Sequence, residues 1–375
     1  MKSFSFARNH LAAPFGGLAF LASFLLSAVC AEAQTATSAY RPGVTPEGAV
    51  YYLPRTALRI SVLVERTSYV PGDFAAYAKR YLRLQDVGLE PVVSHRVLGI
   101  TQMPFGQADP AKAYAVKFNA KTVAANVALA DDGRLLAINA EPQQEKQGDV
   151  AQPFTPAKKA AAVNPRQYMS EEILAAGSKA KMAELTSREI YDLRENRSLI
   201  VKGQADFMPQ DGQQLNLMLA QINTQETALR SLFEGTTTRD TTEHVLTFLP
   251  QKAVSREVLF RLSQKMGMVD ADDLSGEPFY ISIDDISTLP PTDEEEAAKV
   301  KKKDYEAGVY VNVPGRMRST ISQGIDQIGQ AEYPCAQFGN VELLSGDLFN
   351  KHYTTQLWIS PVTGAVERLQ ADIKK

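Results

Sequence analysis

The sequence predicts an α+β fold: a strand-rich N-terminal lobe, a long antiparallel helical hairpin and a strand-rich C-terminal lobe. Before residue 141 and after residue 235, apolar residues alternate with polar ones at a period of two. From 168 to 235 they recur at the three- and four-residue spacing of amphipathic helices. Strands and helices are therefore segregated along the chain, as α+β folds require.

The first 33 residues have the layout of a cleavable secretory signal peptide. Lys2 and Arg8 supply a positive start, and an uncharged apolar stretch follows from 11 to 29. Ala31-Glu32-Ala33 places small residues at the two positions that signal peptidase reads, so we expect cleavage after Ala33 and export. A lipid anchor at Cys30 is disfavoured, because the residue before it is not small.

Charge and cysteine content narrow the class of protein. Removal of the signal leaves 38 basic and 42 acidic residues of the original 40 and 43, a net charge of −4. A nucleic-acid partner would favour a basic surplus, so we expect none. Only Cys335 survives cleavage, which excludes an internal disulfide. No later stretch approaches the ~20 apolar residues of a transmembrane helix, so we expect no span in the mature chain.

The mature chain begins with a polar segment, residues 34–49, which we expect to be a flexible lead. The N-terminal lobe, residues 50–140, opens with a strand over Ala57–Arg66, where apolar residues occupy every second position. Pro71-Gly72 ends this strand, and Asp73 is expected to cap a short helix that runs to Leu82.

Four further strands complete this lobe, over residues 92–100, 113–118, 123–130 and 134–140. Asp131-Asp132-Gly133 separates the last two strands. Asp-Gly readily adopts positive φ, so this triplet predicts a tight β-hairpin.

Residues 141–167 are polar and rich in Pro, so they are expected to form a linker or surface loop. The helical hairpin, residues 168–235, follows. Ser170 is expected to cap its first helix, which ends near Gly203, and Gly235 ends the second. Two helices joined by a short turn are expected to pack antiparallel.

The C-terminal lobe, residues 236–375, returns to a period of two. Strands are expected over 243–249, 258–262, 279–283 and 309–313, with a final hairpin over 353–371. Before the strand at 309–313, Pro290–Tyr305 carries runs of Glu and Lys and is expected to be a solvated loop or helical turn.

Four phrases occur together in a recognisable order: Tyr52–Thr56, Tyr69–Ala78, Ala228–Gly235 and Ala336–Gly339. Their order resembles an uncharacterised family of secreted Gram-negative proteins, domain of unknown function 4831, over most of the mature chain. The resemblance implies the periplasm or outer-membrane periphery and one shared architecture. It assigns no catalytic or binding residue. The Lys-rich stretch around Lys301 departs from the family pattern, as a local insertion would.

Aromatic side chains are the candidate binding residues. Phe74, Tyr77 and Tyr81 fall on one face of the short predicted helix and could form a platform for a sugar or peptide. Packing against a sheet is the more common fate of such a face. Trp358 in the final hairpin could point outward as a contact residue, or it could be packed.

Reactive and metal-binding groups are few. Cys335 and His352 could form a thiol–imidazole pair, although a lone Cys is more often buried and inert. His95, His244 and His352 are the three mature histidines, and their sequence context does not predict a shared metal site. Asp270, Asp272, Asp273 and Glu277 lack the ligand spacing of a calcium loop, so a solvated turn is favoured. We expect no cofactor and no metal.

These observations favour a non-enzymatic, exported cell-envelope protein that acts as a binding, scaffold or assembly component. Its partner is expected to be a protein or a glycan of the envelope. The alternative is a periplasmic hydrolase or carbohydrate-acting enzyme, because a pair of carboxylates needs no sequence signature.

Overall fold

The computed structural model describes residues 36–42, 49–117, 126–142, 154–156, 163–206, 208, 211–290, 308–349 and 353–373. The predicted signal peptide, Cys30, His352 and nearly all of the predicted loop at 290–305 lie outside the described residues. Most of the predicted linker at 141–167 also lies outside them.

Three antiparallel sheets make up most of the molecule. The first sheet has the order β1 (Ala36–Ala39), β3 (Val92–Lys117), β2 (Ala49–Val70) and β6 (Thr236–Phe248). Strands β2 and β3 pair from Ala49↔Val116 to Tyr69↔Val92. At about 3.3 Å per residue, the 22 residues of β2 span about 70 Å.

The second sheet has the order β11 (Asp326–Ser345), β10 (Gly308–Gln323), β9 (Glu277–Asp285), β7 (Val254–Ser263) and β8 (Gly267–Val269). It packs against one face of the first sheet, which is called the inner face below. Strand β11 occupies one edge of this sheet, and the short β8 occupies the other.

The third sheet joins both halves of the chain. Its order is β13 (Val366–Ile373), β12 (Tyr353–Ile359), β5 (Leu135–Ile138) and β4 (Val127–Leu129). The hairpin at Asp131-Asp132-Gly133 is confirmed, since β4 pairs with β5 and Gly133 has a φ of +83°. The final hairpin is confirmed as well, over β12 and β13.

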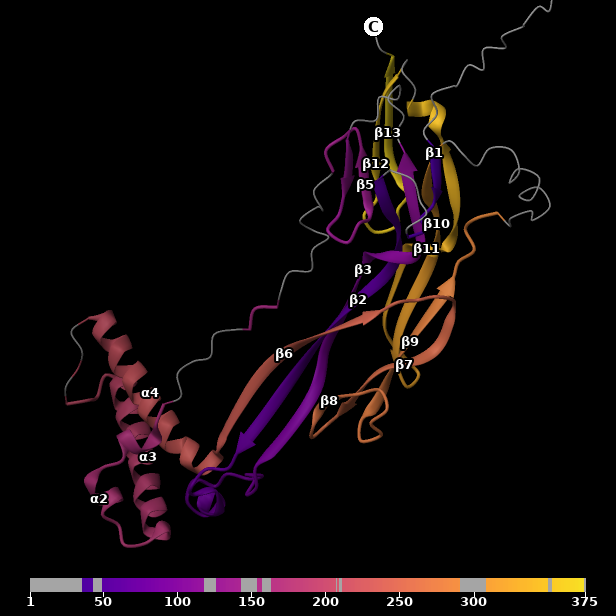
Figure 1. Ribbon diagram of the computed structural model, residues 1–375. Helices are drawn as coiled ribbons and strands as arrows, with labels where there is room; N and C mark the ends of the chain where they lie inside the picture. Colours follow the sequence, from indigo (N-terminus) through magenta and orange to yellow (C-terminus); the bar gives the residue numbers. More distant parts are fainter. Residues whose placement is uncertain are drawn as a thin grey trace, which may run out of the picture.

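A helical lobe lies at the opposite end of the molecule from the third sheet (Figure 1). Its long helices are α3 (Lys179–Lys202) and α4 (Gly212–Glu234), with Gly203 and Gly235 as their C-caps, as predicted. Four short elements complete the lobe: η1 (Ala75–Tyr77), α1 (Ala78–Leu82), η2 (Pro165–Tyr168) and α2 (Glu171–Leu174).

The predicted helical hairpin is only partly correct. Its first helix is broken between α2 and α3, around Gly177, and Ser178 caps α3 by accepting a hydrogen bond from the Lys181 N–H at 3.2 Å. The side chain of Ser170 makes no capping bond to α2. Asp73 likewise does not cap the short helix, and its carboxylate lies 3.6 Å from the Arg166 guanidinium instead.

Three separate cores hold the described residues together. The first fills the helical lobe around Phe74, Ile190 and Phe233. The second lies around Tyr51 and Leu357, between the first and third sheets and the start of β10. The third lies between the first and second sheets around Ile60. The irregular pairing at Pro54 changes which face of β2 is buried, so odd-numbered Tyr51 enters the second core and even-numbered Ile60 the third.

The α+β class is confirmed, but the two predicted lobes are not separate sheets. Strand β6 from the C-terminal half pairs with β2, and β12 pairs with β5 from the N-terminal half. The strands predicted at 92–100 and 113–118 belong to one long strand, β3. Strand β11 was not predicted. Part of the expected flexible lead forms β1, which pairs with the end of β3.

Candidate functional site

The predicted aromatic residues do not form one site. Phe74 is buried in the helical lobe, with its ring centroid 5.4 Å from that of Phe233, so it is a core residue. Tyr77 and Tyr81 lie beside it, half-buried, with ring centroids 6.2 Å apart. Trp358 lies in β12, at the other end of the molecule (Figure 1).

Trp358 is half-buried and engaged within its own sheet. Its indole N–H donates a hydrogen bond to the Glu141 carbonyl oxygen at 3.1 Å. The Arg368 guanidinium lies 4.9 Å from the indole ring centroid, in the geometry of a cation–π contact. These contacts fix the orientation of the indole ring.

Cys335 is not placed as a nucleophile. Its side chain is fully buried, and its Sγ lies 3.4 Å from Oε1 of Gln337. Burial raises the pKa of the thiol above its ordinary value, which disfavours the thiolate that a nucleophilic cysteine needs. His352, the partner considered from the sequence, lies outside the described residues.

The acidic stretch from Asp270 to Glu277 forms a turn that the protein itself stabilises. Asp273 accepts a hydrogen bond from the Ser275 N–H at 2.9 Å, which lowers the pKa of its carboxyl. The guanidinium of Arg261 donates to the Ala271 and Gly276 carbonyl oxygens at 2.7 Å and 3.2 Å. Within the described part of the chain, no three His, Cys, Asp or Glu side chains are grouped to hold a metal ion.

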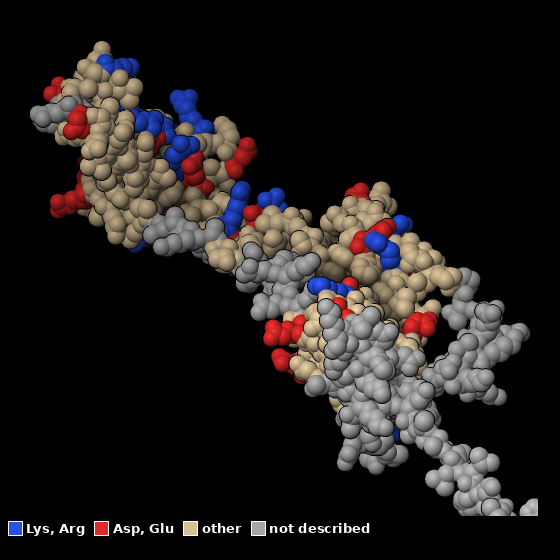
Figure 2. Space-filling model, turned by 90° about the horizontal axis from the view of Figure 1, so that it is seen from above, with Lys and Arg blue, Asp and Glu red and all other residues tan. Residues whose placement is uncertain are grey.

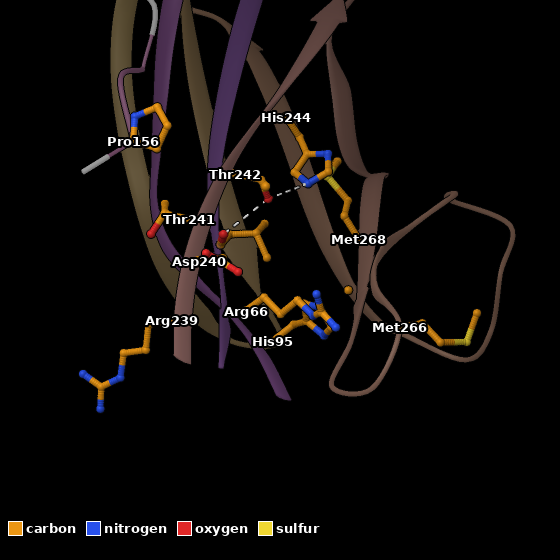
Figure 3. A pocket seen from close by; sticks show the side chains of 12 residues that line it. Arg66, His95, Pro156, Arg239, Asp240, Thr241, Thr242, His244, Met266 and Met268 are labelled. Carbon is orange, nitrogen blue, oxygen red and sulfur yellow. Dashed lines mark hydrogen bonds between the residues drawn. The ribbon is translucent and has the colours of Figure 1, made fainter. Parts of the chain in front are cut away.

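The structure does bring two of the three histidines together. His95 of β3 and His244 of β6 both line an open cavity of about 590 Å³ between the first and second sheets (Figure 3). A second cavity of about 440 Å³ adjoins it and shares His244 and Met268. Together they form a groove that follows β6 from residue 239 to residue 246, with β7 and β8 on the other side.

A polar row crosses one end of this groove. Asp240, Arg66 and His95 lie directly opposite one another on β6, β2 and β3, so their side chains share the inner face of the first sheet. They lie just beyond Val64, where the third core ends. Arg239, the next residue along β6, points away from the cavity (Figure 3).

His95 closes this end of the groove against the second sheet. Its backbone N–H donates to the Gln264 carbonyl oxygen at 2.8 Å, and its Nδ1 lies 3.1 Å from the same oxygen. A carbonyl only accepts, so Nδ1 carries the proton. Gly267 allows this contact, since a Cβ there would lie 3.2 Å from the His95 ring and its φ is +86°.

His244 is held by its neighbour on β6. The Thr242 hydroxyl lies 3.4 Å from the Val64 carbonyl oxygen and 3.3 Å from His244 Nε2. A hydroxyl has one proton. Because Thr242 donates that proton to Val64, its oxygen accepts from His244 Nε2–H.

Apolar side chains line the other end of the groove. Leu246, Leu259 and Met268 are half-buried and pack against the third core without being enclosed by it. Glu243 also borders this end, but both oxygens of its carboxylate accept hydrogen bonds, from the Ser61 hydroxyl and the Phe154 N–H. These bonds lower the pKa of Glu243, so it is not a candidate general acid.

The backbone of β6 is paired on one side only among the described residues. The Thr238 and Thr242 hydroxyls reach the carbonyl oxygens of Ser68 and Val64, directly opposite on β2. Even-numbered residues of β6 therefore direct their N–H and C=O groups to β2, and odd-numbered residues direct theirs to the open side. No described backbone–backbone hydrogen bond outside the strand ladders involves a residue of β6.

This edge was not found from the sequence. The alternation over 243–249 predicted a strand, but nothing in it indicated that the strand would border a groove. Which strands pair, and which one ends a sheet, depends on contacts between residues 166 to 190 positions apart in the sequence.

Fold and groove define an elongated α+β protein with an open sheet edge. Comparison with protein families matches residues 47–367 to the domain of unknown function DUF4831, and the chain belongs to this family. Comparisons with curated proteins and with solved structures gave no match.

Proposed function

We propose that this protein is an exported, non-enzymatic component of the cell envelope that binds another envelope protein, as a scaffold or assembly factor. The observation that carries the proposal is the open edge of β6, which borders a groove between two packed sheets. A strand edge with free backbone groups is a template for association with another chain.

The shape of the molecule supports the same role. Strands β2 and β3 connect the helical lobe to the sheets at the other end, so two distant surfaces are held at a fixed separation (Figure 1). Basic and acidic side chains are interspersed over the helical lobe (Figure 2). Within the described residues, no helix is long and apolar enough to cross a membrane.

Export rests on the first 33 residues of the sequence, with their positive start, apolar stretch and Ala31-Glu32-Ala33. Mass spectrometry of the protein from the periplasmic and membrane fractions tests this part. We expect a mature chain that begins at Gln34. A full-length cytoplasmic chain would contradict it.

The binding role is tested by affinity capture from the native envelope, with a tag after Lys375, followed by mass spectrometry. We expect a stable protein partner at a defined stoichiometry. Recovery of no protein partner, together with glycan binding or turnover by the purified chain, would overturn the proposal in favour of the carbohydrate-acting alternative.

A further inference from the structure

We propose that the groove along β6 binds an extended polypeptide segment of another protein, which adds a strand to the first sheet and places apolar side chains at alternate positions into the groove. This inference rests on the proposed function as a binding protein. It names the chemistry of the partner and the edge that receives it.

The first argument is that the edge of β6 is regular. Strand β6 pairs with β2 over 13 consecutive residues without a register shift. Two other strands have long edges. β11 is interrupted by two irregularities in its ladder with β10 and carries Pro334, and β3, whose described pairing with β1 covers only Tyr114–Lys117, carries Pro104 and Pro110. Proline and bulges are devices that blunt an edge against pairing. β6 has neither.

The second argument is the direction of the backbone groups. Thr241, Glu243 and Val245 direct their N–H and C=O groups to the open side, by the alternation established above. Successive donors and acceptors at a two-residue repeat match the backbone of an extended chain. A sugar or a small ion offers no such repeat.

The third argument is the character of the groove. An incoming strand beside β6 would point every second side chain inward, toward Leu246, Leu259 and Met268. These apolar side chains are half-buried, so an apolar partner residue would complete their enclosure. The polar row of Asp240, Arg66 and His95 limits the apolar stretch at the other end.

Contact with the chain's own segment 154–156 does not occupy this edge through a strand ladder. Phe154 approaches β6 through its N–H, which donates to the side chain of Glu243. Pro156 lines the cavity that holds the polar row but not the adjoining apolar one, so among the described residues the apolar end of the groove is left to a strand added beside β6.

The test uses the mature full-length chain and a displayed library of random 12-residue peptides. We expect the enriched peptides to carry apolar residues at alternate positions. The decisive variant is Val245→Pro, which removes one outward N–H beside the groove without removing a ladder bond to β2. The matched control is Thr237→Pro, an outward position on the same strand, outside the groove.

Val245→Pro is expected to weaken binding of the selected peptides at least tenfold, and Thr237→Pro to leave it within twofold. In the wild-type complex, hydrogen exchange at Thr241, Glu243 and Val245 should slow on peptide addition. This second readout does not depend on how well a proline variant folds. No enriched peptide, enrichment without alternation, or equal effects of the two prolines would overturn the inference.

Two further outcomes separate this inference from the proposed function. If envelope capture recovers the same partner with wild type and with Val245→Pro, the binding role stands and the β6 site is wrong. If sedimentation of the wild type shows a dimer that Val245→Pro abolishes, the occupant is a second copy of the chain, which also contradicts the inference.

Discussion

At the scale of single residues, buried thiol and amide side chains contribute to the packing of the fold. Cys335 has no exposed side-chain surface, and the Asn312 amide donates to the carbonyl oxygens of Pro54 and Thr363 at 3.0 Å and 2.7 Å. That amide joins β10, β2 and the turn between β12 and β13. Hydrogen bonds from a buried side chain of this kind hold distant segments in one packing arrangement.

The reactivity of Cys335 tests its burial. We expect the mature folded chain to react with a thiol-specific chromogenic disulfide at least a hundredfold more slowly than the chain in denaturant, because the raised pKa and the lack of access both suppress the thiolate. Absorbance of the released thiolate measures both rates. Comparable rates would contradict the burial of this side chain.

Glu65 provides a prediction on pH. Its carboxylate lies 2.7 Å from Arg96 Nε on the neighbouring strand, and this hydrogen bond lowers the pKa of Glu65 below its ordinary value of 4.5. Because the folded-state pKa is the lower one, the stabilisation is complete above the unfolded-state pKa and is lost as pH falls through the folded-state pKa.

We therefore expect Glu65→Gln to lower Tm near neutral pH and to flatten the fall of Tm between about pH 6 and about pH 3. Glu90→Gln, at an exposed position between β2 and β3, is the control and should keep the wild-type slope. Thermal scans by circular dichroism give both curves. A wild-type slope in Glu65→Gln would show that this ion pair does not contribute.

At the scale of elements, the contact between the end of β2 and the helical lobe explains one of the sequence phrases on which the family resemblance was based. Gly72 lies against α4, and a Cβ there would lie 2.2 Å from the Leu232 carbonyl oxygen. The Phe74 N–H donates to that same oxygen at 2.7 Å, while Phe74, Ala75 and Ala78 are buried. The phrase Pro-Gly-Asp-Phe-Ala therefore describes a close contact between a strand end and a helix end.

Gly72→Ala is expected to destabilise the protein by about 2 kcal/mol, because backbone atoms would have to move to admit the methyl group. Gly212→Ala is the matched control: nothing lies within 4 Å of a Cβ there, and the first turn of α4 tolerates alanine, so its stability should be unchanged or slightly higher. Urea unfolding followed by circular dichroism measures both. Equal stabilities would contradict the contact.

These elements also show how far the sequence could be read. The period of two located β2, β7, β9 and β10, and the Asp-Gly turn located the hairpin of β4 and β5. It failed for β11, because burial alternates only over Ile328–Pro334, where the less exposed positions include the small residues Gly329 and Ala331, and not over the residues that follow. It divided β3 in two, since Pro104 and Pro110 resemble strand ends although the strand continues through them.

The groove could not be predicted because its residues come from strands that are distant in the sequence. His95 and His244 were identified as separate residues of separate strands, and only the order β3, β2, β6 places them on one face. Composition limited the candidate reactive groups of the mature chain to one cysteine and three histidines. The sequence contains the members of the polar row but not the register that aligns them.

At the scale of the whole molecule, elongation is the main property. A compact chain of about 340 residues would have a radius of gyration of about 20 Å. The 22-residue β2 alone spans about 70 Å, with the helical lobe beyond one end.

Small-angle X-ray scattering of the mature chain should therefore give a radius of gyration clearly above the value of about 20 Å for a compact chain. Its distance distribution is expected to have a long tail. The measurement should be repeated at several concentrations, so that association is not mistaken for length. A value close to that of a compact chain would mean that the helical lobe folds back on the sheets in solution.

The long pairing of β2 with β3 and β6 has a mechanical consequence. If the two ends of the molecule are held by different neighbours, tension between them acts along the strands. Because β2 and β3 both run from the helical lobe toward the third sheet, their covalent backbones carry this tension in parallel, and the hydrogen bonds between them hold the two strands in register. The central ladder would then act as a stiff tie between the two anchoring points.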